Sequence, residues 1–254
     1  MMQYIRIRSI SPGFGLLLLL SLLLAGCLPR TVVPLKTLKY DLAPGSDKLV
    51  VMLPGRGEAL GKLKDRGVFE TMRSRGYDVV VAGLHLGYYI EGSFIRRLRE
   101  DVLLPARAKG YKHIWLVGNS MGGNGSLFYI REYPSEIDGV VLLGPYLGEK
   151  EIVDEIASAG GVALWEHGEI NEGDSQRALW AFIKKMPPGT PPVFMAYGAH
   201  DRFSEAQGLL ASVLPPGRTV AIEGGHDWWT WKRAWDMLFS RGIEEQKEDG
   251  RPLP

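Results

Sequence analysis

Cysteine is nearly absent from this chain of 254 residues, because Cys27 is the only one. A single cysteine cannot form a disulfide within the chain, so the fold has to be stabilised by a buried apolar core. An excess of charge of one sign is also lacking, since 30 basic side chains face 29 acidic ones and the formal net charge is +1. Without a long basic run after the N-terminal segment, nucleic-acid binding has no electrostatic support.

Nucleotide-binding and metal-binding motifs are missing as well. No Gly-Lys-Ser or Gly-Lys-Thr sequence occurs, although a phosphate-binding loop requires one. The turn 55–61 is similar to a dinucleotide fingerprint, but its third glycine comes one residue late and the next predicted strand ends without an acid. His85, His113 and His167 lack the spacing of metal ligands. The sequence therefore predicts no cofactor and no metal.

The N-terminal segment combines a basic start with a short apolar run. Arg6 and Arg8 precede the apolar residues 14–25, a run that is too short to span a membrane and is typical of a secretory signal. Its last residues, Leu-Ala-Gly-Cys at 24–27, resemble the lipobox of bacterial lipoproteins. The resemblance implies that residues 1–26 are a signal peptide and that Cys27 carries a lipid such as palmitate. The alternative is an ordinary signal peptide that happens to precede a cysteine.

A lipidated cysteine would anchor the protein to a membrane of the cell envelope. Leu28 follows that cysteine, and it is not the aspartate that resembles an inner-membrane retention signal. In a Gram-negative cell the expected location is therefore the outer membrane, facing the periplasm.

Beyond the signal, the sequence predicts a short anchor and linker (27–44), one α/β domain (45–240) and a polar tail (241–254). Near-continuous apolar runs alternate with helical stretches, a pattern typical of a mostly parallel sheet with helices on both faces. The strands are expected at 48–53, 77–82, 113–117, 139–143, 192–197 and 218–222, with an edge strand near 37–42 inside the linker. Helices are expected at 68–75, 93–108 and 126–133. The interval 148–185 breaks the alternation and predicts a small cap, in which Trp165 and Trp180 could contact an apolar substrate.

A Gly-x-Ser-x-Gly motif occupies residues 118–122, with Ser120 at its centre. It lies between the predicted strand 113–117 and the predicted helix 126–133. A strand that turns sharply into a helix exposes the serine hydroxyl, and the flanking glycines let backbone and substrate approach closely. The motif predicts a nucleophile at Ser120. Alternatively, Ser120 is only a small residue in a tight turn.

Asp201 and His226 also follow predicted strands. Because the carboxyl ends of parallel strands meet at one edge of the sheet, both are expected to lie near Ser120. A serine hydroxyl is a weak nucleophile, and imidazole, with a pKa of ~6.5, is suited to take its proton. A carboxylate on the other ring nitrogen fixes the tautomer of the base. The alternatives are that Asp201 caps a helix starting near residue 204 and that His226 is packed in a loop.

The chain order Ser120, Asp201, His226, together with an aromatic soon after the Gly-His pair, resembles the serine hydrolases of the α/β-hydrolase superfamily, esterases and lipases among them. The resemblance covers most of the chain after the signal and implies the α/β-hydrolase fold. It also implies that the backbone N–H of Met121 and a second N–H, from Arg56 or Gly57, form an oxyanion hole.

The chain departs from that family in the turn that carries the second donor. It has Pro54-Gly55 where relatives commonly have His-Gly. Proline has no N–H, but it precedes the donor position, so we expect the oxyanion hole to survive with altered geometry.

Four tryptophans cluster directly after His226. The spacing of residues 228, 231 and 235 predicts one helical face that packs on the sheet. Trp228 and Trp229 are close enough in sequence to the base to line a substrate pocket instead. His200, beside Asp201, is a further candidate for substrate binding.

These features predict an exported, lipid-anchored serine hydrolase that cleaves carboxylic esters through an acyl-enzyme, with a small-molecule ester or acyl compound as substrate. An envelope peptidase or amidase, or a thioesterase, would use the same residues. A lipoprotein that keeps the fold only for binding is the alternative from another class.

Overall fold

The computed structural model describes residues 29–40 and 45–245. The predictions for the signal peptide, for Cys27 and for residues 246–254 lie outside the described residues. Within the described part of the chain, no helix is long and apolar enough to cross a membrane.

The described residues form one seven-stranded sheet with the strand order β1-β3-β2-β4-β5-β6-β7. Every neighbouring pair is parallel except β1 and β3. This arrangement confirms the predicted mostly parallel sheet. The strands are β1 (Thr37–Tyr40), β2 (Lys48–Leu53), β3 (Asp78–Ala82), β4 (His113–Asn119), β5 (Gly139–Leu143), β6 (Val193–Gly198) and β7 (Thr219–Ile222).

The central strands are apolar throughout because both faces of the sheet are covered. Along β2, Leu49, Val51 and Leu53 belong to one core, and Val50 and Met52 belong to the other. Alternating side chains of a strand point to opposite faces, so a run of consecutive apolar residues is what such a strand requires.

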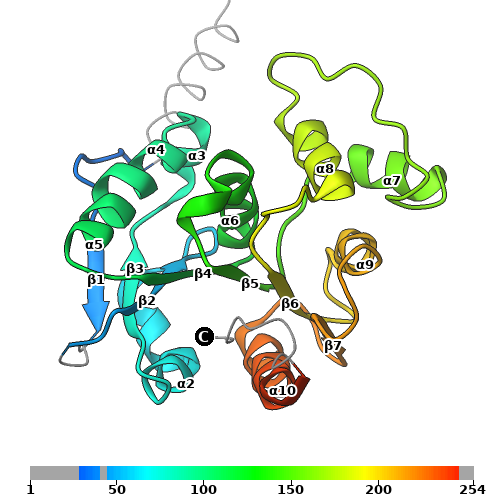
Figure 1. Cartoon of the computed structure of the whole chain (residues 1–254). Helices are drawn as coiled ribbons and strands as arrows, with labels where there is room; N and C mark the ends of the chain where they lie inside the picture. Colours follow the sequence, from blue (N-terminus) through cyan, green and yellow to red (C-terminus); the bar gives the residue numbers. More distant parts are fainter. Residues whose placement is uncertain (1–28, 41–44, 246–254) are drawn as a thin grey trace, which may run out of the picture.

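Helices cover the two faces unequally (Figure 1). One face carries α2 and α10, and the other carries the longer run of helices from α3 to α9. The helices are α2 (Val68–Arg73), α3 (Leu86–Ile90), α4 (Phe94–Leu98), α5 (Leu104–Ala108), α6 (Met121–Glu132), α7 (Lys150–Ser158), α8 (Ser175–Lys185), α9 (Ser204–Ala211) and α10 (Trp228–Glu245). Three short turns complete them, η1 (Leu60–Arg66), η2 (Arg99–Leu103) and η3 (Pro134–Glu136).

The helix expected at 93–108 is interrupted. Its middle, η2, has π-helical hydrogen bonding and joins α4 to α5. Pro105 lies at the start of α5, and proline can neither donate an N–H nor tolerate the carbonyl of residue 101 at α-helical distance. The wider turn accommodates the ring, so the helix continues with an altered register.

The segment 148–185 contains α7 and α8, and the expectation for its tryptophans was wrong. Trp165 and Trp180 are 1% and 0% exposed. The Trp165 indole N–H donates to Glu155 at 2.8 Å, and that of Trp180 donates to the Leu147 carbonyl at 2.8 Å. Both rings therefore hold the segment on the main core instead of facing a substrate.

At both ends of the described chain, the structure extends into the segments predicted as linker and polar tail. Before β1, the Val32 N–H donates to the Tyr88 hydroxyl at 3.0 Å and the Leu35 N–H donates to Asp101 at 2.7 Å. Part of the predicted linker is thus bound to α3 and η2. At the other end α10 continues to Glu245, so the predicted polar tail begins as helix.

Candidate active site

The turn between β4 and α6 holds Ser120 in a rare backbone conformation. Its φ and ψ are 50° and −115°. A non-glycine residue in this region is strained, and such residues concentrate at functional sites. The Ser120 N–H donates to the Leu143 carbonyl at 2.9 Å, and the Ser120 carbonyl accepts from the Tyr146 N–H at 3.0 Å. These bonds to the neighbouring strand end fix the turn.

Both glycines of the motif are required by close backbone contacts. A Cβ at Gly118 would lie 2.3 Å from the Gly122 carbonyl oxygen. A Cβ at Gly122 would lie 2.0 Å from the carbonyl oxygen of Leu53, at the end of β2. The helix α6 can therefore start directly after the serine and close to the sheet, because positions 118 and 122 carry no side chains. This is why α6 begins at Met121, several residues before the expected 126.

The structure brings Ser120, Asp201 and His226 together. His226 Nε2 lies 3.0 Å from Ser120 Oγ, and His226 Nδ1 lies 2.7 Å from Asp201 Oδ2. Because a carboxylate only accepts, Nδ1–H donates to Asp201 and Nε2 is left to accept the serine proton. The Asp201 side chain is fully buried and the His226 side chain is 12% exposed.

The imidazole is also held by two aromatic rings. Phe203 and Trp231 meet it edge to face, with ring centroids at 5.1 and 4.7 Å. The carboxylate below and the rings on its sides restrict its rotation, so Nε2 stays directed at the serine.

Asp201 has a second set of contacts. Its Oδ1 accepts from the Phe203 N–H at 2.9 Å, and its carbonyl accepts from the Ser204 N–H at 2.8 Å. The alternative that Asp201 caps this helix was wrong, because the N-cap residue of α9 is Phe203. The Asp201 carboxylate instead stabilises the turn before α9 and also contacts His226. The neighbouring carboxylate, Asp227, is bonded to the Thr230 N–H and hydroxyl at the start of α10. The Thr230 N–H lowers the pKa of Asp227.

The loops that carry Asp201 and His226 are locked to each other. A Cβ at Gly198 would lie 2.4 Å from the Gly224 carbonyl oxygen, and the same carbonyl accepts from the His200 N–H at 2.9 Å. Gly224 has a φ of 146°. Glycine at both positions lets the ends of β6 and β7 present their side chains at hydrogen-bonding range.

A cavity of about 650 Å³ opens above Ser120 and His226. Arg56 and Gly57, the two candidates for the second oxyanion donor, both line it. Met121 is the first residue of α6, where the N–H has no partner within the helix. The Gly55 N–H is engaged with Asn119 Oδ1 at 3.1 Å, so it is not free to bind an oxyanion.

Glu58 was missed by the sequence analysis. Its carboxylate accepts from Asn119 Nδ2 at 3.0 Å and from the Trp228 indole N–H at 2.5 Å. It therefore joins the residue before Ser120 to the second residue after His226. No local sequence pattern predicts this role of Glu58. The one available signal is the presence of an acid in the turn after the strand 48–53.

The pocket candidates separate into two groups. Trp228 lines the cavity, and so does Trp231, which the spacing had assigned to core packing. Trp229 is 68% exposed and stacks with Arg233, whereas His200 is bound to Glu223 on the surface, 2.7 Å away. Neither Trp229 nor His200 lines this cavity.

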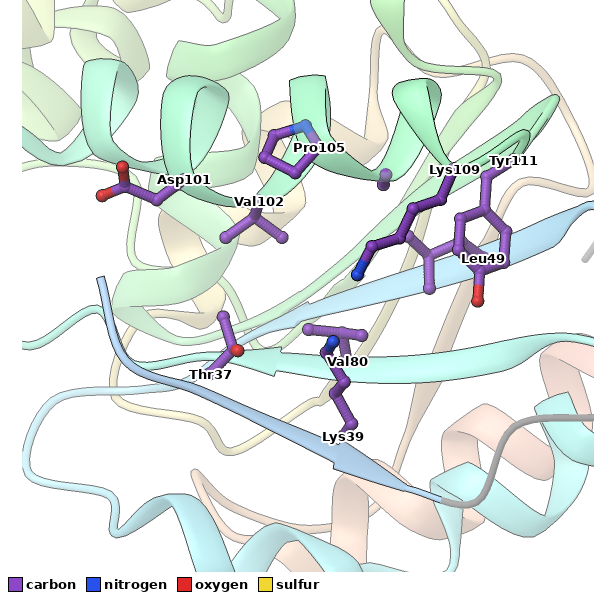
Figure 2. A pocket seen from close by; sticks show the side chains of 10 residues that line it. Thr37, Lys39, Leu49, Val80, Asp101, Val102, Pro105, Lys109 and Tyr111 are labelled. Atoms are coloured by element: carbon purple, nitrogen blue, oxygen red, sulfur yellow. The ribbon is translucent and has the colours of Figure 1, made fainter. Parts of the chain in front are cut away.

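A smaller cavity of about 120 Å³ lies elsewhere, between β1, β3 and the turn of η2 and α5 (Figure 2). Lys39 and Lys109 stand at it, and Lys109 lowers the pKa of Lys39. Its lining contains no serine, cysteine or histidine, so it lacks the residues of the Ser120 arrangement.

The sheet order, the strained serine turn and the position of the histidine loop after the last strand define the class: the chain has the α/β-hydrolase fold. Residues 48–161 match the family described as alpha/beta hydrolase fold. No curated protein matches the sequence significantly.

Solved structures show the same fold over most of the chain. An alpha/beta hydrolase from a sediment metagenome of the Mar Chica lagoon, Morocco, is 21% identical with a TM-score of 0.55, covering 85% of this chain and 98% of its own. Est1E from Butyrivibrio proteoclasticus is 16% identical with a TM-score of 0.56, covering 84% and 98%. The Paleococcus ferrophilus monoacylglycerol lipase is 17% identical with a TM-score of 0.50, covering 82% and 99%. Together with the family match, these structures show that the chain has the α/β-hydrolase fold.

Proposed function

We propose that this protein is a serine hydrolase that cleaves carboxylic esters through an acyl-enzyme. The observation that carries the proposal is the hydrogen-bonded chain from the strained Ser120 through His226 to the buried Asp201. In this reading Ser120 is the nucleophile, His226 the general base and then general acid, and Asp201 the group that orients the imidazole.

The geometry supports a two-stage reaction. Ser120 Oγ attacks the ester carbonyl while its proton passes to His226 Nε2, and the resulting oxyanion accepts the N–H groups of Met121 and of Arg56 or Gly57. The intermediate collapses, His226 returns the proton to the leaving alcohol, and the acyl group stays on Ser120. Water, deprotonated by His226, then attacks the acyl-enzyme, and release of the acid restores the serine.

Ester cleavage is preferred over amide cleavage for two reasons. The structural neighbours include proteins named as a ferulic acid esterase and a monoacylglycerol lipase. The cavity is also broad and open at Ser120, which suits small to medium esters. The competing hypotheses are an amidase or a thioesterase that uses the same residues, and a lipoprotein that only binds its ligand.

Matched substrates separate ester cleavage from amide cleavage. We expect 4-nitrophenyl butyrate to be hydrolysed with a kcat/KM roughly 100-fold or more above that of butyryl-4-nitroanilide. The reason is that 4-nitrophenolate is a better leaving group than 4-nitroaniline, which has to be protonated as it departs. A fluorophosphonate probe should label Ser120 in the same preparation. Faster anilide cleavage would indicate an amidase, and an unlabelled folded protein would indicate a binding role.

We also propose export and lipid anchoring through Cys27, on the strength of the lipobox-like sequence at residues 24–27. The expected result is that the Cys27→Ser variant, expressed in a bacterial host, moves from the membrane fraction to the soluble fraction, because one sulfur carries the anchoring lipid. Metabolic labelling with a clickable palmitate analogue should mark the wild-type chain only. Equal membrane retention of both chains would contradict the proposal.

A further inference from the structure

The cavity above Ser120 is lined by more basic than acidic side chains. Four lining residues are basic and two are acidic; the basic ones are Arg56, Lys62, Arg66 and Arg202, and the acidic ones Glu58 and Asp227. The chain as a whole is almost neutral, so this excess is a local property of the site.

Both acids are already engaged by the protein. Glu58 accepts from Asn119 and Trp228 and lies 4.0 Å from the guanidinium of Arg66. Asp227 accepts from the N–H and the hydroxyl of Thr230. Arg66 is therefore compensated by Glu58, and neither carboxylate is available to offset the other three cations.

Arg56, Lys62 and Arg202 are exposed, and no carboxylate of residues 29–40 or 45–240 is within 4 Å of their charged groups. The Arg202 guanidinium lies over the ring of Phe203, 4.9 Å from its centroid. Holding three cations around one opening is unfavourable unless an anion is present, and the low-dielectric wall of a cavity strengthens their combined field.

These cations flank the nucleophile. Arg56 and Lys62 follow β2, which pairs with one side of β4. Arg202 follows β6, which lies on the other side of β4 beyond β5. Since Ser120 directly follows β4, an ester bound at its hydroxyl has positive charge on both sides.

We propose that the natural substrate carries an anionic group, a carboxylate or phosphate, in addition to its ester, and that Arg56, Lys62 and Arg202 bind this group. The inference rests on the proposed function, because it specifies the substrate class of the same site. Arg56 takes part through its side chain, independently of any role of its N–H.

Two pairs of esters test the inference, with the charge on the acyl part in one and on the alcohol part in the other. The first compares mono-4-nitrophenyl adipate with 4-nitrophenyl hexanoate. The second compares the butyrate esters of 4-hydroxybenzoate and 4-hydroxybenzamide. We expect the ratio of kcat/KM, charged over neutral, to fall about 2- to 5-fold in Lys62→Met and in Arg202→Met, in at least one pair. High salt should lower the same ratio in the wild type, because exposed charges are screened.

Lys64→Met is the matched control, because Lys64 is an exposed lysine on the same turn, η1, and does not line the cavity. Its ratios should equal those of the wild type. Unchanged ratios in both Lys62→Met and Arg202→Met, for both ester pairs, would overturn the inference.

A binding measurement keeps the two proposals separable. The monoamide of adipic acid, which is an anion, should protect Ser120 from fluorophosphonate labelling at lower concentration than the uncharged hexanamide does. This advantage should disappear in the Lys62→Met/Arg202→Met double variant. If no ester is hydrolysed but this protection by the anionic amide is observed, the ester proposal fails and the anion site is supported. If neutral esters are hydrolysed and the anionic amide gives no advantage, the anion site fails alone.

Discussion

Replacing Ser120 by alanine is expected to reduce ester turnover by roughly 10⁴- to 10⁶-fold, the loss typical when the nucleophile of a serine triad is removed. The hydroxyl is the only group of the described cavity that combines a nucleophilic oxygen with a base at 3.0 Å. Residual rate would come from the oxyanion donors and substrate binding, which the substitution leaves in place.

The fold should survive this change. Alanine and serine both carry a Cβ, so the strained φ of 50° costs the variant no more than it costs the wild type. Thermal unfolding of Ser120→Ala should therefore follow the wild type within a few degrees, while fluorophosphonate labelling disappears.

Ser126→Ala is the matched control. Ser126 lies on the same helix, α6, and its hydroxyl donates to the Gly122 carbonyl at 2.9 Å, away from the histidine. This substitution also removes a serine hydroxyl, but from the second turn of α6, and turnover and labelling should both persist. Strong activity in Ser120→Ala, or loss of labelling in Ser126→Ala, would place the nucleophile elsewhere.

The features that could be predicted from the sequence are those that local patterns encode. Parallel strands buried on both faces leave uninterrupted apolar runs, and a strand–turn–helix around Ser120 needs glycines at 118 and 122. The candidates Asp201 and His226 were found because each follows a strand, and the carboxyl ends of parallel strands share one edge.

What the sequence did not reveal depends on contacts between distant segments. Glu58 and Trp228 are separated by 170 residues, and nothing near either residue encodes their hydrogen bond. Trp165 and Trp180 lie in a segment whose helices could pack against the core or face solvent. Their burial follows from the docking of that segment on the core, which the local sequence does not encode. The break in the helix expected at 93–108, in contrast, has a local cause. It could have been predicted from Pro105.

Replacing Asp201 by asparagine is expected to lower kcat on the order of 10⁴-fold, with a much smaller change in KM. Oδ1 accepts from the Phe203 N–H, so an amide in this place keeps its oxygen there and turns its NH₂ toward His226. An NH₂ group is a donor, and it requires Nδ1 to be the unprotonated nitrogen. The proton then resides on Nε2, which faces Ser120 and can no longer accept the serine proton.

The two roles of Asp201 can be distinguished by measuring stability beside activity. If the carboxylate serves chiefly to stabilise the turn before α9, Asp201→Asn keeps the bond from the Phe203 N–H and should leave both unfolding and turnover near wild type. If it orients the base, unfolding stays near wild type while turnover and the rate of fluorophosphonate labelling fall together. Glu223→Gln is the control in the neighbouring loop, because it removes only the charge of a surface carboxylate that contacts His200, and its activity should stay within about 2-fold of the wild type. A wild-type labelling rate in Asp201→Asn would show that the buried carboxylate does not set the tautomer of His226.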